Sequence, residues 1–221
     1  MTEPVLARLT TLFEADRDPA KAAAMRAYMR DQFVFLGIMA PRQRELARAA
    51  TIGVGRPTEA GLLALADVCW ARDEREYQYF ACGYLRRHVA VLTPAALPSV
   101  RRLIATKPWW DTVDLLAARV VGPMVAGHGA LTAAMDDWIA DDDIWVIRTA
   151  LLHQLFYKRE TDAERLFGYC TRQAGHTDFF IRKAIGWALR EYAKTDPDRV
   201  RAFVATTELS GLSRREALKN R

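Results

Sequence analysis

The sequence predicts an all-α fold, because almost every segment of its 221 residues has apolar positions at helical spacing and no stretch alternates convincingly like a strand. Gly, Pro or Asp separates the short helices, which come in pairs. Tryptophans at 70, 110, 145 and 187 are 40, 35 and 42 residues apart, near the ~40–47-residue period of two-helix HEAT or armadillo units. We therefore predict a single domain over 1–221, a curved solenoid of stacked antiparallel helix pairs with a concave face. An ordinary multi-helix bundle would give the same helix count.

The expected helices follow from their apolar faces and start signals. An apolar face over 6–13 indicates the first helix, and Asp18 followed by Pro19 is typical of the start of a second one that runs to about residue 30. The apolar run 33–38 could be extended, but Gly37 and the following proline favour a helix end and a new start. Later helices are expected at 41–50, 58–70, 74–88, 94–106, 108–121, 130–140, 143–157, 161–174, 178–193, 197–206 and 213–220.

Composition limits the class of protein. Hydrophobic residues make up 51% of the chain, which excludes a disordered protein and allows a sizeable core. The net charge of +5 is compatible with a polyanionic partner but does not require one. Three cysteines without a CxxC motif predict a reducing cytoplasm rather than a disulfide framework. The longest apolar stretch, 115–126, is too short to cross a bilayer, so no membrane association is expected.

Familiar cofactor and metal motifs are missing from the sequence. It has no HExxH, no Cys/His cluster, no P-loop and no GxGxxG, and its four histidines are scattered. No serine or cysteine lies in a nucleophile motif. We therefore expect neither a metal nor a cofactor, and the candidate chemistry rests on aromatic residues, carboxylates and arginines near helix starts.

The most unusual pair of residues is Trp110 and Asp114. With Thr106 as N-cap and Pro108 in the first turn, the two side chains are four residues apart on one helix face. A large indole beside a carboxylate is costly to bury and odd to expose, so the pair is either a structural corner or a site. Taken alone, the pair favours the corner. Trp109 points about 100° away and is expected to be the core partner.

Three further candidate residues, Arg148, Arg182 and Gly186, lie in helical segments later in the sequence. Arg148 and Arg182 occupy equivalent places in two similar segments, WVIRTA and FFIRKA, each of which follows an Asp-containing helix start. A structural arginine that pairs with a neighbouring aspartate explains both equally well. Gly186, directly before Trp187, indicates a close approach of the backbone to another element.

Several blocks together resemble the AlkD-type DNA alkylation repair glycosylases. They are residues 28–29 with FLGI, then KPWWDTVD, then DIW with Arg148, and then KAIGW with LREYAK. The resemblance runs nearly the whole length and ends with LSRREA at 212–217. The WWDxVD and AIGWxLREY blocks are specific and occur in the expected order.

This resemblance implies an all-α, HEAT-like repeat protein that wraps duplex DNA on its concave face. It implies a monomeric, monofunctional glycosylase of base excision repair that excises cationic alkylated purines, N3-methyladenine and N7-methylguanine, without flipping the base. Carried over by position, the catalytic carboxylate is Asp114, and the indoles that flank the lesion are Trp110 and Trp187. The tyrosine and arginine of the cleft are Tyr28 and Arg148.

The chemistry suits these residue types. Alkylation at N3 or N7 places a positive charge on the purine, so the base leaves without a general acid. Its departure produces an oxocarbenium-like sugar, which a nearby carboxylate stabilises. Indole faces also favour a nearby cation. A scaffold that only binds DNA or protein, the main alternative, has no reason to keep a carboxylate on its DNA face.

Basic residues near helix ends are expected to contact phosphates without strong sequence preference. For any one of them a solvated surface role is as good an interpretation. A lyase that forms a Schiff base through Lys107 or Lys183 is a further alternative, but nothing in the sequence indicates a lysine of lowered pKa. The expected DNA-binding residues are Lys107, Arg148, Arg182, Lys183, Arg190, Arg214 and Arg215.

Overall fold

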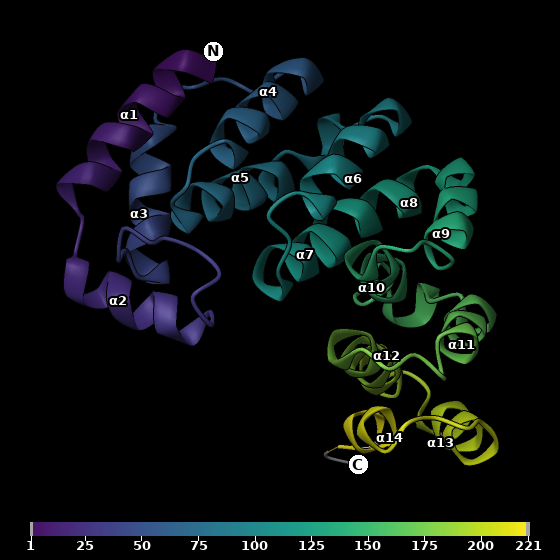
Figure 1. The fold of residues 1–221 in the computed structure, drawn as a ribbon. Coiled ribbons are helices and arrows are strands. Elements are labelled where there is room, and N and C mark those ends of the chain that lie inside the picture. Colours follow the sequence, from purple (N-terminus) through teal and green to yellow (C-terminus); the bar gives the residue numbers. More distant parts are fainter. Residues whose placement is uncertain (1, 220–221) are drawn as a thin grey trace. The chain divides into compact units, whose positions relative to one another are not determined.

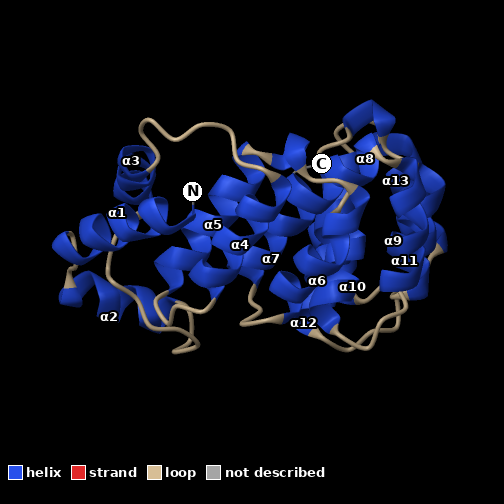
Figure 2. Ribbon diagram, turned by 90° about the horizontal axis from the view of Figure 1, so that it is seen from above, coloured by secondary structure: helices blue, strands red, loops and turns tan. Residues whose placement is uncertain are grey.

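The computed structural model describes residues 2–219, and this part of the chain is helical, with no strand beyond an isolated bridge between Val34 and Glu74 (Figures 1 and 2). The predicted all-α class is confirmed. The chain divides into two compact units, one up to residue 99 and the other from residue 100 onward. No described helix is long and apolar enough to cross a membrane.

In its described residues, from 2 onward, the first unit contains five complete α-helices. α1 packs on α3 and α4, and α5 packs on α3 and α4. Leu9, Phe13, Leu62 and Tyr77 are fully buried in its core. The helices are α1 (Thr2–Ala15), α2 (Pro19–Tyr28), α3 (Ala40–Ala50), α4 (Glu59–Trp70) and α5 (Arg75–Arg87), followed by 3₁₀ turns at Val89–Val91 and Pro94–Ala96.

A buried carboxylate shapes the apolar run between α2 and α3. Glu76, which is fully buried, accepts hydrogen bonds from the backbone N–H groups of Leu36, Gly37 and Ile38 at 3.0, 2.8 and 3.2 Å. Gly37 has φ +95°, and a Cβ there would lie 2.0 Å from the Asp18 carbonyl oxygen. The run is therefore a loop held by Glu76 and not the end of a helix, since α2 already ends at Tyr28. The expected new helix start after it is confirmed, at Ala40.

The second unit holds the helices that carry the predicted catalytic residues. α10 contacts α7, α9, α11 and α12, and α12 contacts α11, α13 and α14. The boundary between the units falls within α6 (Leu97–Ala105). The remaining helices are α7 (Trp110–Leu116), α8 (Gly122–Gly127), α9 (Thr132–Trp138), α10 (Ile144–Leu152), α11 (Ala163–Arg172), α12 (Phe179–Tyr192), α13 (Pro197–Thr206) and α14 (Gly211–Ala217).

The expected helix over 108–121 is broken and starts later than predicted. Trp109, with extended backbone angles, is the N-cap of α7, and it makes no side-chain capping bond. Lys107 has φ +49°, in the left-handed region, so the chain turns at this residue and does not enter a helix there. The roles predicted for Thr106 as N-cap and Pro108 in the first turn are therefore wrong. A π-helical turn, Ala117–Val121, then separates α7 from α8.

The expected helix over 143–157 also ends early, at Leu152. A Cβ on Gly122 would lie 2.3 Å from the carbonyl oxygen of His153, so α8 begins in close contact with the chain just after α10. The residues that follow form turns, and 3₁₀ geometry returns at Lys158–Glu160.

The close approach predicted at Gly186 is confirmed. A Cβ at this position would lie 2.4 Å from the Glu216 Cβ and 2.8 Å from the Ser213 carbonyl oxygen. Ser213 also donates its hydroxyl to the Arg182 carbonyl oxygen at 3.0 Å. α12 and α14 can therefore approach this closely only with glycine at position 186.

Replacing Gly186 by alanine should lower the free energy of unfolding by about 1–3 kcal/mol, because the added methyl group overlaps backbone as well as side-chain atoms of α14. Gly168 on α11 is a matched control, since its Cβ would meet nothing within 4 Å. Gly168→Ala should leave stability unchanged or raise it by up to about 1 kcal/mol through helix propensity. Urea denaturation checks both, and equal stabilities for the two variants would contradict the close approach.

A buried histidine should make stability depend on pH. Burial lowers the pKa of His153 to about 4, and its Nδ1 lies 2.7 Å from the Ala150 carbonyl oxygen. Below the unfolded pKa of 6.5, the His153 side chain binds a proton in the unfolded chain but stays neutral in the folded protein. The free energy of unfolding therefore falls as pH decreases towards 4, by about 3 kcal/mol in total. Urea titrations between pH 7 and pH 4 measure this, and His153→Gln should remove most of the slope.

The matched control for that slope is His128→Gln, because His128 is exposed. This variant should keep the wild-type dependence of unfolding free energy on pH. If His153→Gln kept it as well, the slope would have to come from other groups and the assignment to His153 would be wrong.

Candidate active site

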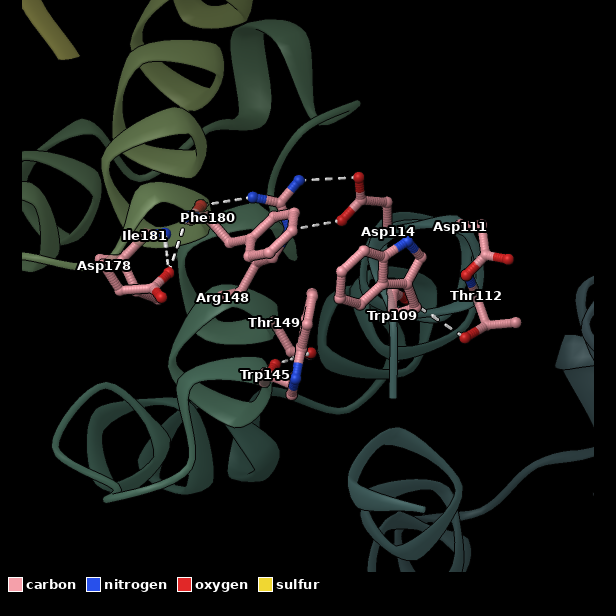
Figure 3. Close-up of polar contacts among 10 residues, drawn as sticks. All are labelled: Trp109, Asp111, Thr112, Asp114, Trp145, Arg148, Thr149, Asp178, Phe180 and Ile181. Carbon is pink, nitrogen blue, oxygen red and sulfur yellow. Dashed lines mark hydrogen bonds and ion pairs between the residues drawn. The ribbon is translucent and has the colours of Figure 1, made fainter. Parts of the chain in front are cut away.

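An ion pair joins α7 and α10 in the second unit (Figure 3). Arg148 donates from Nε to Asp114 Oδ1 at 2.6 Å and from Nη2 to Asp114 Oδ2 at 2.8 Å. Its remaining nitrogen, Nη1, donates to the carbonyl oxygen of Phe180 at 2.5 Å. The guanidinium group is thus held by both carboxylate oxygens and by the first turn of α12.

The two partners differ in exposure. The Arg148 side chain is 5% exposed and that of Asp114 is 16% exposed. Burial raises the pKa of the Asp114 carboxyl, while the hydrogen bonds and charge of Arg148 oppose that rise. A carboxylate has about four lone-pair sites, and Arg148 uses two of them. The rest of the carboxylate remains able to face a water molecule or a substrate.

Helix caps fix the starts of α10 and α12, and so the positions of Arg148 and Phe180 along them. Asp143 caps α10 by accepting from the Trp145 N–H at 2.8 Å, which places Arg148 just over one turn later. Asp178 caps α12 by accepting from the N–H groups of Phe180 and Ile181 at 2.7 and 3.2 Å. These caps explain why the sequence starts both helices where it does.

Three aromatic rings pack together beside the ion pair. The ring centroids of Trp109 and Trp145 are 5.8 Å apart, those of Trp109 and Phe180 5.1 Å, and those of Trp145 and Phe180 4.9 Å. Trp109 packs against both other rings, but it is only half-buried, like Trp110, so the expected core position of Trp109 is not seen. We refer to these three residues as the aromatic cluster. Sequence reasoning missed Trp145 and Phe180 as site residues, although each stands in one of the two similar segments, just after a capping aspartate.

The two predicted lesion-flanking indoles lie on helices of the same unit. Trp110 is half-buried and precedes Asp114 by one turn on α7. Trp187 is half-buried on α12, which packs on α10. Both therefore retain exposed surface near helices that hold the ion pair, as a contact to a ligand would require.

Two of the predicted DNA-binding cations form ion pairs with one carboxylate. Lys183 Nζ and Arg190 Nη1 lie 3.0 and 2.9 Å from the two oxygens of Glu216 on α14. Both cations lower the pKa of Glu216, with the hydrogen bond from Lys183 as the largest cause. Their charges are engaged within the α12–α14 contact.

The remaining basic residues differ in environment. Arg182 is half-buried and donates from Nε to the His176 carbonyl oxygen at 2.8 Å, so it pairs with a backbone group rather than with an aspartate as Arg148 does. Arg214 and Arg215 are exposed on α14, and Arg214 donates to the Thr207 carbonyl oxygen at 3.4 Å. Lys107 is half-buried just before α7.

Tyr28 belongs to the first unit, at the end of α2, and is 72% exposed. It lines an apolar hollow of about 300 Å³ together with Met25, Met29, Phe35 and Tyr79, among others. This hollow is a feature of the first unit alone. Its lining is almost entirely apolar, so any contact made there would be to the face of an aromatic group or to an alkyl group.

Metal ligands are not grouped in the described part of the chain: no three His, Cys, Asp or Glu side chains of residues 2–219 are arranged to hold an ion. The three cysteines are buried. The chemistry that the described site can offer is that of a carboxylate in a fixed orientation beside aromatic faces.

A family model described as DNA alkylation repair enzyme matches residues 9–220. The chain belongs to this family. A solved structure from Enterococcus faecalis, described as a predicted DNA alkylation repair enzyme, is 32% identical and superposes with a TM-score of 0.84, covering 92% of this chain and 96% of that one. A search of curated protein sequences finds no significant match.

A second solved structure shares the fold. The smu.31 protein of Streptococcus mutans UA159 is 14% identical, with a TM-score of 0.62 and coverage of 81% of this chain and 92% of that one. Membership of the DNA alkylation repair enzyme family supports an enzymatic role in the repair of alkylated DNA, with DNA as the partner.

Proposed function

We propose that this member of the DNA alkylation repair enzyme family is a monofunctional DNA glycosylase. It hydrolyses the N-glycosidic bond of cationic alkylated purines, N3-methyladenine and N7-methylguanine, in duplex DNA without flipping the base, as a first step of base excision repair. The observation that carries the proposal is the Asp114 carboxylate, which Arg148 holds by both oxygens while 16% of its side chain stays exposed.

The reaction needs little from the protein beyond this carboxylate. A cationic purine leaves as a neutral base, so no acid has to protonate it. The charge moves to the sugar, which becomes oxocarbenium-like, and Asp114 stabilises it and orients the attacking water. At about 4 Å and an effective dielectric constant of about 20, a full unit charge pair gains about 4 kcal/mol.

Arg148 has two opposing effects on that gain. Its positive charge offsets part of the attraction between Asp114 and the sugar, because the guanidinium group contacts the carboxylate at 2.6 Å. Its two hydrogen bonds also fix both oxygens in one orientation, so that the carboxylate needs no reorganisation as charge develops. Half-buried Trp110 and Trp187 add indole faces, each worth about 0.5–2 kcal/mol towards a nearby cation.

DNA binding completes the proposal. We take the helix pairs to be HEAT-like repeats of a curved solenoid whose concave face receives the duplex, with the protein acting as a monomer in the cytoplasm. Tyr28 would contribute an aromatic contact from the first unit. Exposed Arg214 and Arg215, with Lys107 and Arg182, would contact phosphates, while Lys183 and Arg190 contribute less because Glu216 already pairs with them.

Release of free base tests the activity. Duplex DNA that contains one N7-methylguanine is incubated with the protein, and free N7-methylguanine is measured against its spontaneous release. We expect release well above the spontaneous rate, and none from an unmodified duplex. Tight binding without enhanced release from the N7-methylguanine or an N3-methyladenine duplex would instead support the non-catalytic scaffold.

A further inference from the structure

The three helices that meet at the ion pair each begin with one ring of the aromatic cluster. Trp109 is the N-cap of α7, which carries Asp114, and Trp145 is in the first turn of α10, which carries Arg148. Phe180 is in the first turn of α12, and its carbonyl oxygen accepts the third hydrogen bond of Arg148. Figure 3 shows the side chains of Trp109, Trp145 and Phe180 close to one another beside the Asp114–Arg148 pair.

The start of α7 depends on its ring more than the other two helix starts do. α10 and α12 have capping aspartates, Asp143 and Asp178, whereas α7 begins without a side-chain cap. α7 is also only seven residues long, so it has few internal bonds to fix its position. Buried Thr112 and Val113 hold the body of this short helix. Trp109, little more than one turn before Asp114, is the residue whose ring joins the start of α7 to the starts of α10 and α12.

The buried N–H of Trp109 makes no hydrogen bond, so what this indole contributes is the size and position of its ring. Its Nε1 atom is buried and has no hydrogen-bond partner. An unpaired buried donor costs about 1–3 kcal/mol, which a phenylalanine would avoid. A phenylalanine would fill less of the space between Trp145 and Phe180, which lie 5.8 and 5.1 Å from Trp109 by ring centroids.

We propose that the aromatic cluster positions the Asp114–Arg148 pair, with Trp109 as the positioning residue for the carboxylate. Trp109 fixes the start of α7 against the starts of α10 and α12, and this sets where the Asp114 oxygens lie relative to Arg148. Its catalytic consequence rests on the glycosylase activity proposed above. A misplacement of about 1 Å in such a site costs about 10²-fold in rate.

Trp109→Leu tests the proposal, with Phe167→Leu as a matched control. Phe167 is an aromatic residue of the same unit that packs on Phe203 and Tyr192, away from the cluster. At saturating N7-methylguanine duplex and in single turnover, we expect Trp109→Leu to release base about 10- to 100-fold more slowly, with its DNA dissociation constant changed less than about threefold. Phe167→Leu should keep the wild-type rate per folded molecule, and Trp109→Phe should recover most of it.

A second readout does not depend on the activity. The pKa of the Asp114 carboxyl is followed by ¹³C NMR in protein without DNA. The charges that act on it are Arg148 from α10, which lowers the pKa, and Asp111 from α7, which raises it, while α12 presents only the neutral Phe180 carbonyl to Arg148. Burial is the largest cause of the raised pKa of Asp114, and the Arg148 contact opposes it. Trp109→Leu changes both the burial of the carboxyl and its contact with Arg148, so it should shift this pKa, whereas Phe167→Leu should leave it unchanged.

The outcomes separate the two proposals. A shifted Asp114 pKa in Trp109→Leu together with an inactive wild type would uphold the positioning role and reject the glycosylase activity. An active wild type with the same rate and the same Asp114 pKa in Trp109→Leu would overturn the positioning role. Equal losses in Trp109→Phe and Trp109→Leu would overturn it too, because an aromatic ring at position 109 would then do nothing for the ion pair that leucine does not.

Discussion

Asp114→Asn should slow the release of N7-methylguanine by about 10³-fold while DNA binding is retained. The asparagine side chain has nearly the same shape but no charge, so it withdraws the attraction between the carboxylate and the oxocarbenium-like sugar. An attraction of about 4 kcal/mol corresponds to roughly 10³ in rate at about 1.36 kcal/mol per decade. Single-turnover base release at saturating DNA measures this effect directly.

Binding should separate this effect from a general loss of structure. A carboxylate on a DNA-facing surface repels phosphates, so its neutralisation should leave affinity unchanged or strengthen it. Asp137→Asn, at an exposed position on α9, is the matched control and should release base at the wild-type rate. Equal rates for wild type and Asp114→Asn would exclude the catalytic role of this carboxylate.

Arg148→Met should lower the free energy of unfolding by about 3 kcal/mol and also remove most of the activity. The substitution leaves Asp114 largely buried without its partner, and removing one member of a buried pair costs about 3–5 kcal/mol. The Phe180 carbonyl oxygen also loses its hydrogen bond from Nη1. Urea denaturation measures the loss of stability, and base release measures the loss of activity.

Two comparisons sharpen this second expectation. Arg165→Met removes a more exposed cation, which pairs with Asp136 and Asp162, and should cost about 1 kcal/mol or less. The double variant Asp114→Asn/Arg148→Met removes both charges and should be more stable than Arg148→Met alone, because no buried carboxylate is left unpaired. Single and double variants of the same stability would show that the pair is not coupled in the folded protein.

Local signals explain how much of the fold could be predicted. Asp18 followed by Pro19, and the aspartates before α10 and α12, place three helix starts closely, because capping is a short-range interaction. The start of α7 was misplaced because Trp109 begins that helix through packing with rings 36 and 71 residues away in the chain. The π-helical turn after α7 likewise has no signal in the apolar spacing.

In the candidate site, too, the sequence predicts individual residues but not the pairs that they form across helices. The sequence indicates Asp114 and Arg148 as separate candidates, but only the structure shows that they form one ion pair. Lys183 and Arg190 look like surface cations because their partner, Glu216, lies 26 or more residues further along the chain. Pairings of this kind depend on how helices dock, and a single sequence carries no local trace of them.

Glu216 also determines how the chain meets a polyanion. A phosphate that approached Lys183 or Arg190 would compete with a carboxylate already within 3.0 Å of each cation. Few condensed counterions would then be released along α12, because release accompanies the neutralisation of phosphates by unpaired charge. The number of cations near the site therefore overestimates the electrostatic part of the DNA affinity. We expect α12 to contact DNA through its shape and the indole of Trp187 more than through its charge.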